Sequence, residues 1–331
     1  MPLKVKEFRE YLVGRGQGED AAGSAVGYVR EFERRLGEQG KRLDAASVED
    51  MKWYVSELMA EGLNTFERVV ALQRYLNFIG RREEAVHLYF VLSATIIYGS
   101  ISDRLARLTD DETKSRVFGR VSVPPIGAPT DQFPQVTRWL MDSLAEELDQ
   151  ATLRRVLAGN HHGVPAESFA KHREWLAEAG SLDGLLKRMH DEAVAELTRY
   201  MEEGRMWFEQ MITPEVVELV RGNQEMLSAV RDGEWLYETK IPFAPADWLL
   251  EEDPTMKRFY ACHCPLARSA IVSGGVELPL DWCYCSGGYG KWRFDVLFGA
   301  ETEVEVLESA LAGSDRCRFR IRIPESNKRG Y

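Results

Sequence analysis

Apolar residues recur at helical spacing over the first two thirds of the 331-residue chain, and this pattern limits its fold most strongly. Residues 66–79 form one such stripe, with apolar side chains at Phe66, Val69, Leu72 and Leu76. After Gly233 the pattern changes to short segments rich in aromatic and β-branched residues. Residues 303–313 and 317–324 alternate on either side of a Gly-Ser-Asp turn. They predict a terminal antiparallel hairpin.

Three regions are predicted along the chain: a helical bundle over residues 1–96, a mostly helical region over 97–232 and an α+β region over 233–331. In the first region Ser47 and Asp50 have the spacing of a capping box, in which each side chain bonds the other residue's backbone amide. The predicted fold class is α+β, with an N-terminal all-helical bundle, a helical middle and a C-terminal domain containing an antiparallel sheet.

Proline and glycine mark the expected breaks in this pattern. Four prolines within residues 121–134 prevent a continuous helix, so residues 97 to about 130 are expected to connect the first bundle to the rest. In the last region, residues 235–243 and 257–263 are aromatic and β-branched enough to predict strands. Residues 287–299 show helical spacing after a glycine-rich start and predict a helix.

Composition and charge limit the class of protein. A hydrophobic content of 44% with 29% charged residues is typical of a folded globular chain. The formal net charge of -11 argues against broad binding to phosphate backbones, which requires a basic surface. The N-terminus lacks the apolar core of a secretory signal, and no uninterrupted apolar run reaches membrane-spanning length. We therefore expect a cytoplasmic protein that binds neither nucleic acid nor membrane.

Four of the five cysteines fall within one window of 24 residues, as the pairs Cys262 with Cys264 and Cys283 with Cys285. Thiols stay reduced in the cytoplasm, so clustered cysteines are expected to bind a metal or to react rather than to form disulfides. Four thiolates satisfy the tetrahedral coordination of zinc, which leads among the metals. Residues two apart on a strand stand about 7 Å apart, so both pairs would have to lie on turns. Pro265 and Gly287 make turns credible at both places.

Other roles stay open for these thiols. An iron–sulfur cluster also takes four cysteines, although the usual ferredoxin spacings are absent. A reactive or redox-active thiol pair, a disulfide formed by an oxidant and unremarkable buried cysteines are the remaining alternatives. Cys317, which stands apart from the window, would be an ordinary core residue on the apolar face of a strand.

Residues 284–321 contain a Ser-Gly-Gly-Tyr step, a helix ending in Phe-Gly, an acidic strand, a glycine-containing turn and a Cys-Arg-Phe step. In these features the segment resembles the 4-vinyl-reductase-type domain, a small-molecule-sensing module. In that family the cysteine of the Cys-Arg-Phe step binds zinc with a cysteine eight residues earlier and a nearby acidic residue. The resemblance assigns these positions to Cys317, to Ser309, which is a poor zinc ligand, and to Glu308 or Glu305. It therefore implies that ligands are recruited from the two Cys-x-Cys pairs.

Two further resemblances bear on function. The late cysteine pattern and α+β ending are similar to the proteins grouped around L-2-amino-thiazoline-4-carboxylate hydrolase, which implies opening of a small heterocycle by water. The helices of residues 1–96 resemble the SAM-like helical domain with which tyrosine recombinases clasp DNA, although the catalytic half of that family is not found. These residues contain 14 Lys and Arg against 15 Asp and Glu. We therefore expect them to dock a protein partner or a second copy of the chain, because DNA binding requires a basic excess.

The adjacent residues His161 and His162 lie in a glycine-flanked loop between two predicted helices. Adjacent side chains diverge, so at most one is expected to face the cysteines, as a metal ligand or a general base. A polar loop that caps a helix is the alternative. His263 lies between Cys262 and Cys264 and is expected to point away from both.

Arg268, Tyr289 and Lys291 flank the cysteine window. A guanidinium, a phenol hydroxyl and an ammonium suit a pocket for an anionic or aromatic small molecule. The alternative is a solvated helix face for the two cations and ordinary packing for the ring. His162, Tyr289 and Lys291 are the candidates for catalysis if the site is enzymatic.

The leading hypothesis is a sensor-like protein that binds a small molecule at a site anchored by a cysteine-ligated metal, zinc. Its candidate metal ligands are Cys262, Cys264, Cys283, Cys285 and Cys317. A metal-dependent hydrolase acting on a small amide or heterocycle is one alternative, because an open position on zinc can activate water. An iron–sulfur or thiol redox protein is the other. The sequence thus leaves open whether the chain is an enzyme.

Overall fold

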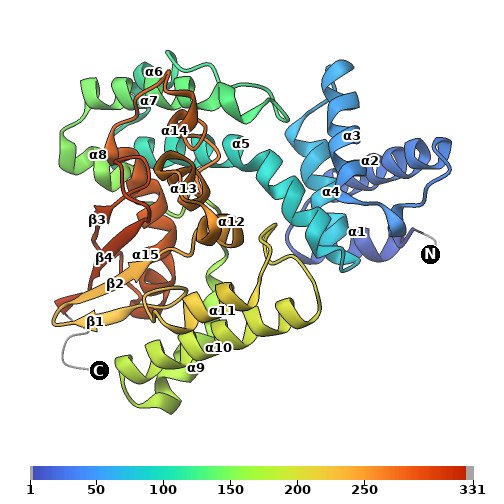
Figure 1. Ribbon diagram of the computed structural model, residues 1–331. Helices are drawn as coiled ribbons and strands as arrows, with labels where there is room; N and C mark the ends of the chain where they lie inside the picture. The colour runs from blue at the N-terminus through green and yellow to red at the C-terminus, as the bar shows by residue number, and fades with distance from the viewer. Residues whose placement is uncertain (1–2, 326–331) are drawn as a thin grey trace. The chain divides into compact units, whose positions relative to one another are not determined.

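A computed structural model describes residues 3–325, and the chain divides into two compact units (Figure 1). The N-terminal unit runs to Thr95 and includes Pro124–Pro129. The C-terminal unit is formed by Ile96–Val123 and the chain from Thr130 onward. Its helices and small antiparallel sheet confirm the predicted α+β class.

Helices form all the regular structure described in the N-terminal unit. They are α1 (Val5–Gly14), α2 (Glu19–Glu38), α3 (Val48–Ala60), α4 (Phe66–Phe78) and the first half of α5 (Arg82–Leu108), with a short 3-10 helix at Leu43–Ala45. Their apolar faces meet in an aromatic core, where the rings of Phe32 and Tyr54 lie 4.6 Å apart. The predicted capping box is confirmed, because Ser47 N donates to Asp50 Oδ2 at 2.8 Å and Asp50 N donates to Ser47 Oγ at 3.4 Å.

Helix α5 belongs to both units and corrects one expectation. By length and composition it could cross a membrane, with a mean hydropathy of 1.5 over its most apolar window, 44% of which is buried inside the protein. The buried side chains include Leu88, Leu92, Ile101 and Leu105. A core helix of a soluble protein passes the same test of length and composition. The expected connection over residues 97 to about 130 is wrong, because α5 continues to Leu108 and a second helix follows at Asp111–Phe118. The non-helical segment that contains the prolines begins only at Gly119.

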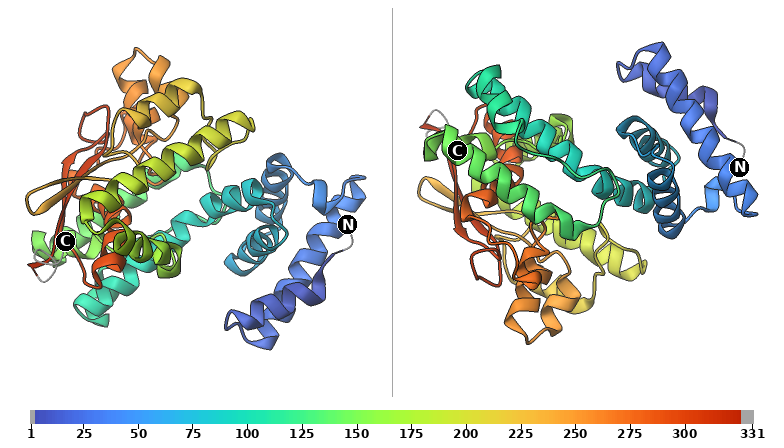
Figure 2. Two further views of the ribbon diagram at one scale, coloured as in Figure 1. Left: turned by 90° about the horizontal axis from the view of Figure 1, so that it is seen from below. Right: turned by 90° about the horizontal axis from the view of Figure 1, so that it is seen from above.

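The C-terminal unit begins with helices that the sequence pattern predicts well (Figure 2). They are α6 (Asp111–Phe118), α7 (Phe133–Glu147), α8 (Gln150–Leu157), α9 (Ala170–Ala179), α10 (Leu182–Glu202) and α11 (Pro214–Arg221), with 3-10 helices at Thr130–Gln132 and Ala166–Phe169. Side chains cap several of these helices at their start. Asp149 accepts a bond of 2.9 Å from the amide of Thr152, for example, and so satisfies one free donor of α8.

Strands and short helices alternate in the last hundred residues. The strands are β1 (Val230–Asp232), β2 (Trp235–Thr239), β3 (Val304–Glu308) and β4 (Arg318–Arg322), and the helices are α12 (Pro245–Leu250), α13 (Pro254–Ala261), α14 (Ala270–Ser273) and α15 (Tyr284–Phe298), the last preceded by a 3-10 helix at Leu280–Cys283. The predicted strand over residues 257–263 is wrong. Asp253 caps a helix there by accepting a bond of 2.8 Å from the amide of Met256, and Pro254 suits its first position.

The four strands form one antiparallel sheet in the order β1-β2-β4-β3. The predicted hairpin of β3 and β4 is confirmed, with Val304 opposite Ile321 and a bulge between Val306 and Glu308. Phe319 and Ile321 alternate with three arginines along β4 and are buried. One face of the sheet is therefore apolar, and helix α15 lies against it (Figures 1 and 2).

Two glycines allow α15 to pack this closely. A Cβ atom on Gly287 would lie 3.1 to 3.3 Å from Val304 and Phe319 in the sheet. On its other side, a Cβ on Gly288 would meet the backbone of Ala158 and Gly159 at 2.5 to 2.8 Å. The glycine-rich start of this helix thus serves close packing, because only a residue without a side chain fits between these groups.

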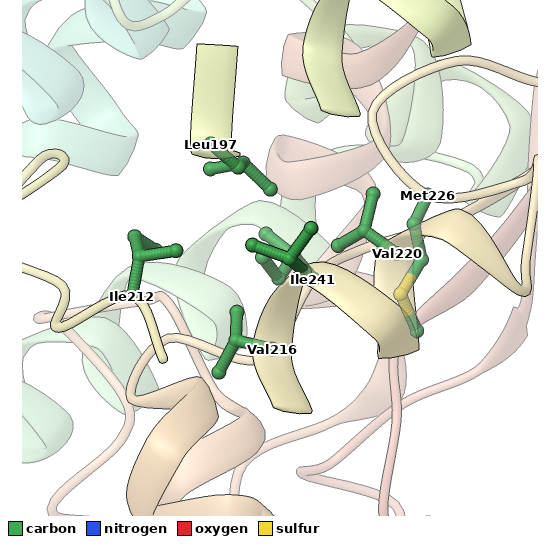
Figure 3. Close-up of a cluster of buried hydrophobic side chains, with 7 residues drawn as sticks. Leu197, Ile212, Val216, Val220, Met226 and Ile241 are labelled. Atoms are coloured by element: carbon green, nitrogen blue, oxygen red, sulfur yellow. The ribbon is translucent and has the colours of Figure 1, made fainter. Parts of the chain in front are cut away.

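An apolar cluster fixes the chain where it leaves β2. Its buried members come from α10, α11 and the segments beside them: Leu197, Ile212, Val216, Val217, Val220, Met226 and Ile241 (Figure 3). Ile241 follows the end of β2 by two residues and is 3% exposed. The backbone around residue 240 is therefore held from both sides, by the sheet and by this cluster.

Candidate functional site

Lys240 and Cys317 lie side by side at one end of the sheet. Lys240 directly follows β2 and Cys317 directly precedes β4, and the amide of Lys240 donates to the carbonyl of Cys317 at 2.9 Å. This bond extends the pairing of the two antiparallel strands by one step. Strand register therefore sets a lysine beside a cysteine that is 77 positions away in the sequence.

The first cysteine pair reaches this place from the end of α13. Cys262 directly follows that helix as its cap, and its amide donates to the carbonyl of Arg258 at 3.1 Å. Cys264 begins a turn, because its carbonyl accepts a bond of 2.9 Å from the amide of Arg268. The indole Nε1 of Trp282 donates to Cys264 Sγ at 3.3 Å. The pair thus lies on the irregular backbone that its spacing and Pro265 predict.

The second pair lies at the start of α15. Cys283 ends the preceding 3-10 helix and Cys285 lies in the first turn of α15. Cys283 Sγ lies 2.9 Å from Ser309 Oγ, so these two side chains share a hydrogen bond. All five cysteines are free thiols, and only Cys264 is more than slightly exposed to solvent.

The charges of these groups interact. Burial is the largest cause that raises the pKa of each of the five thiols, and negative charge on Cys317, Cys264 and Cys283 raises the pKa of Cys262 further. The nearby Lys240 ammonium lowers the pKa of Cys264, Cys283, Cys285 and Cys317. One cation therefore lies within electrostatic range of four thiols. We call Lys240 and the five cysteines the cysteine-lysine cluster.

The Lys240 ammonium is bound by neutral groups. It donates to Ser286 Oγ at 2.9 Å and lies 5.1 Å from the centre of the Tyr289 ring. Within residues 3–325 no carboxylate lies at ion-pair distance from it. Arginines of the nearby sheet differ in this respect, since Arg318 pairs with Glu225 at 2.7 Å.

The two adjacent histidines diverge as the sequence predicts. His161 is fully buried, with Nε2 2.9 Å from the carbonyl of Val156 and Nδ1 3.0 Å from Ser100 Oγ, and burial lowers its pKa to about 4. His162 lies with its ring 4.9 Å from that of Tyr289. Burial and then the charge of Lys240 lower the pKa of His162 to about 3. His162 is therefore a neutral imidazole near the cysteine-lysine cluster at physiological pH.

His263 and Arg268 surround the first cysteine pair. His263 Nε2 lies 2.6 Å from the carbonyl of Ile241, and burial followed by the Lys240 charge lowers the pKa of His263 to about 3. The guanidinium of Arg268 lies 4.1 Å from the ring centre of Phe243 and 4.7 Å from that of Phe259. Burial lowers the pKa of Arg268, while negative charge on Cys262 and Cys264 raises it. Arg268 is thus a second cation in electrostatic range of the cluster.

Lys291 has a different environment. It is 2% exposed, and its ammonium lies 2.5 Å from Asp295 Oδ2 one helical turn away. Asp295 also accepts bonds of 2.7 Å from the amide and the hydroxyl of Thr302. The expectation of a solvated helix face for Lys291 is wrong, because this network holds the side chain inside the protein. Tyr289 by contrast is 45% exposed and contacts both Lys240 and His162.

Sequence reasoning missed Lys240, Ser286 and Trp282. One signal was available for Lys240, because Leu236, Glu238 and Lys240 share one side of β2 by alternation and Leu236 is buried. A cation at the buried side of a strand requires a partner or a function. Ser286 and Trp282 gave no comparable signal, since their roles depend on how α15 meets the sheet.

The carboxylates that the 4-vinyl-reductase resemblance suggests as metal ligands have arginine partners here. Glu308 pairs with Arg316 at 2.7 Å and Glu305 accepts a bond of 2.7 Å from Arg320. Ser309, at the position of the family's second cysteine, instead contacts Cys283. The nearest thiol to that position thus comes from the second Cys-x-Cys pair.

The donors of the cysteine-lysine cluster fit zinc in number and type, since zinc prefers thiolates. Their placement does not fit it in the present arrangement. Among residues 3–325, no three His, Cys, Asp or Glu side chains are positioned to hold a metal ion together. Zinc or an iron–sulfur cluster would require side-chain movement, for which Cys283 would have to leave Ser309. Both cofactors stay predictions.

The comparisons with known proteins give one match. Residues 237–328 match the model of a family of unknown function, DUF6144. This segment is less than a third of the chain, and it contains Lys240 and all five cysteines. No curated protein and no solved structure matches the chain.

Proposed function

We propose that the C-terminal unit binds a small molecule with an anionic group, a carboxylate or a phosphate, at the cysteine-lysine cluster. The observation that carries this proposal is the environment of Lys240, whose ammonium is bound by Ser286 Oγ and the Tyr289 ring in an acidic protein. Most cations of the unit are paired with carboxylates. An ammonium bound only by neutral groups retains donors for an anion.

A second cation supports the same conclusion. Arg268 and Lys240 both interact electrostatically with Cys264, so two positive charges act on one region. His162 and His263 are neutral near pH 7, so the positive charge of this region comes from Lys240 and Arg268, and the Glu209 carboxylate also acts on Arg268. Tyr289 and the phenylalanine rings beside Arg268 offer apolar surface for the rest of a ligand. This arrangement supports the proposal of a small aromatic or aliphatic acid as the ligand.

The proposed role, location and partners of the protein complete this hypothesis. We propose a sensor-like role in the cytoplasm, where the five free thiols would stay reduced. The N-terminal helices would then dock a protein partner or a second copy of the chain. A metal-dependent hydrolase remains an alternative to the sensor.

Zinc binding is a second candidate function. The observation that favours it is the convergence of five free cysteines from three separate segments, which is unusual in one buried region of a single chain. Cys262, Cys264, Cys283 and Cys317 are thiols that interact through their charges, since the other three each raise the pKa of Cys262. They would hold the metal after rearrangement, and zinc would then anchor the segments around the ligand.

Ligand-induced stabilisation tests the anion proposal. The full chain would be unfolded in urea with and without benzoate, acetate or inorganic phosphate at fixed ionic strength. A ligand at a hundred times its dissociation constant stabilises a protein by about 2.7 kcal/mol. We expect at least one of these anions to stabilise the protein, and Lys240→Met to abolish the effect.

Lys257→Met is the matched control for this experiment. Lys257 lies in the same unit and its ammonium lies 4.7 Å from the ring centre of Trp248, much as Lys240 lies over Tyr289. The control should keep the full stabilisation. Equal stabilisation of the wild type and Lys240→Met, or no stabilisation by any of the anions, would contradict the proposal.

A further inference from the structure

A groove opens on the C-terminal unit between α10 and the end of α11. Its volume of about 520 Å³ is in the range of small-molecule sites. Val194 lines the groove and packs against the apolar cluster of α10 and α11, so a shared core joins the two helices that form it (Figure 3). The described residues that line the groove include no member of the cysteine-lysine cluster.

The ring of His190 lines this groove and keeps one nitrogen without a partner. The residue is 7% exposed, and its Nε2 lies 2.8 Å from the carbonyl oxygen of Val220. Because a carbonyl only accepts, Nε2 carries the ring proton, and Nδ1 of the neutral ring is an acceptor. Nδ1 has no hydrogen-bond partner among residues 3–325, and it is not sealed from solvent. A buried ring therefore offers an oriented lone pair to a molecule in the groove.

Gln224 is held in the same way. Its Nε2 donates to the carbonyl of Ala229 at 3.1 Å, which fixes the amide and leaves Oε1 as an acceptor. In the part of the chain that the structure describes, Oε1 has no hydrogen-bond partner either. Two side chains of the groove thus donate to backbone carbonyls and keep acceptors for the hydroxyl groups of a ligand.

The charges of the groove favour an anion. Among its described lining residues, Lys187 and Arg221 are cations and Asp191 is the acid, so the lining has a net positive charge in a chain of formal net charge -11. Lys187 pairs with Asp191 at 2.7 Å within α10, and Arg221 pairs with Glu218 within α11. All four side chains are at least half exposed, and exposed ion pairs contribute little to stability. Both cations can therefore turn to an anion at small cost.

We propose that this groove binds a small phosphorylated polyol. A phosphate monoester carries nearly two negative charges at neutral pH, which suit the two cations Lys187 and Arg221. His190 Nδ1 and Gln224 Oε1 accept hydrogen bonds from its hydroxyl groups. An anion without hydroxyls would leave both acceptors unpaired, and a neutral polyol would leave the cations with their own carboxylates. The inference is independent of the anion site around Lys240, because the two sites share no described residue.

The test compares glycerol 3-phosphate with propyl phosphate, which has the same charge and no hydroxyl, and with glycerol, which has no charge. Isothermal titration calorimetry on the full chain would measure the three dissociation constants at fixed ionic strength. We expect glycerol 3-phosphate to bind about fivefold more tightly than propyl phosphate, and glycerol not to bind. Lys187→Met and Arg221→Met should each weaken the binding of glycerol 3-phosphate about tenfold. Arg199→Met is the matched control, because Arg199 lies on α10 but does not line the groove, and it should bind as the wild type does.

His190→Gln tests the acceptor itself. The glutamine amide can still donate to the Val220 carbonyl, but it has no acceptor at the position of Nδ1. This variant should bind the two phosphates with nearly equal affinity. In the wild type, the ¹⁵N signal of His190 Nδ1 should shift on titration with glycerol 3-phosphate, which locates the ligand in the groove. Near-ultraviolet circular dichroism would show that each variant is folded.

The outcomes separate this inference from the proposed function. Equal affinity of the wild type for the two phosphates, or unchanged binding in Lys187→Met and Arg221→Met, would overturn the groove site. If Lys240→Met alone abolishes binding and the His190 signal does not move, the phosphate binds at the cysteine-lysine cluster, which overturns this inference and supports the proposed function. If binding depends on Lys187 and Arg221 while no anion effect depends on Lys240, the groove site is supported and the proposed function is overturned.

Discussion

The ammonium of Lys240 donates a hydrogen bond of 2.9 Å to the hydroxyl of Ser286. This bond joins the end of β2 to the first turn of α15, which also contains Cys285. The sheet and the helix are thus tied together at the cysteine-lysine cluster. Cys283 directly precedes α15, Cys285 lies in its first turn and Cys317 directly precedes β4, so the same junction determines where three thiols lie.

The Lys291→Met variant tests whether Lys291 has a structural role, in contrast to the ligand-binding role proposed for Lys240. The ammonium of Lys291 is buried with Asp295, and removing it leaves a buried carboxylate without its cation. We expect a loss of about 3 to 5 kcal/mol in the free energy of unfolding, measured in urea. Lys240→Met should cost much less, since it leaves no buried carboxylate unpaired.

The double variant Lys291→Met with Asp295→Asn is the control for this interpretation. The asparagine oxygen can still accept the two bonds from Thr302, and no charge stays buried. The double variant should therefore recover part of the lost stability. Equal stability of wild type and Lys291→Met would show that the ion pair contributes little.

Gly288→Ala tests the close packing of α15. The new methyl would meet the backbone of Ala158 and Gly159, which cannot move aside as a flexible side chain can. We expect a loss of about 1 to 3 kcal/mol in the free energy of unfolding. Gly275→Ala, at an exposed position with open space around it, should change stability by less than about 0.5 kcal/mol. An unchanged free energy of unfolding in Gly288→Ala would mean that α15 lies farther from the backbone of residues 158 and 159 than the structure shows.

His161 should make the protein less stable in acid. Its folded pKa of about 4 lies below the ordinary histidine value of 6.5, so between these pH values the unfolded chain binds a proton that the folded chain does not. The contribution is therefore complete above pH 6.5 and is lost as pH falls toward 4. With about 1.4 kcal/mol for each pKa unit, the loss reaches about 3 kcal/mol.

His161→Gln removes this titration and keeps hydrogen-bonding groups near Val156 and Ser100. The fall in unfolding free energy between pH 7 and pH 5, measured in urea, should be about 2 kcal/mol smaller in the variant than in the wild type. An identical fall in both proteins would place the acid sensitivity elsewhere.

The sequence predicted what depends on local periodicity. Helix α4, the capping box of Ser47 and the hairpin of β3 and β4 follow from spacing and alternation over a few residues. Strand β2 was also predicted, whereas α13 was assigned as a strand because its aromatic residues outweighed the cap at Asp253. Propensity is a weak guide where one capping residue and one proline decide the outcome.

The site could be predicted only in part, because local spacing does not determine which distant residues meet. The cysteine pairs are visible as a pattern, but their neighbours depend on the register of β2 with β4 and on the approach of α15. Lys240 is 22 residues before Cys262, and no spacing rule connects them. Lys291 has the residue type expected of a ligand-binding cation, yet the neighbouring Asp295 determines its role.

Zinc content tests the second candidate function. Elemental analysis of protein purified without chelator or oxygen should find about one zinc per chain, since one tetrahedral site takes four ligands. Cys283→Ser and Cys317→Ser should each lower this content, because both thiols lie in electrostatic range of Cys262. Iron with sulfide would instead favour a redox protein. Unchanged zinc in both Cys283→Ser and Cys317→Ser would exclude these thiols as ligands, and the anion site around Lys240 would then stand without a metal.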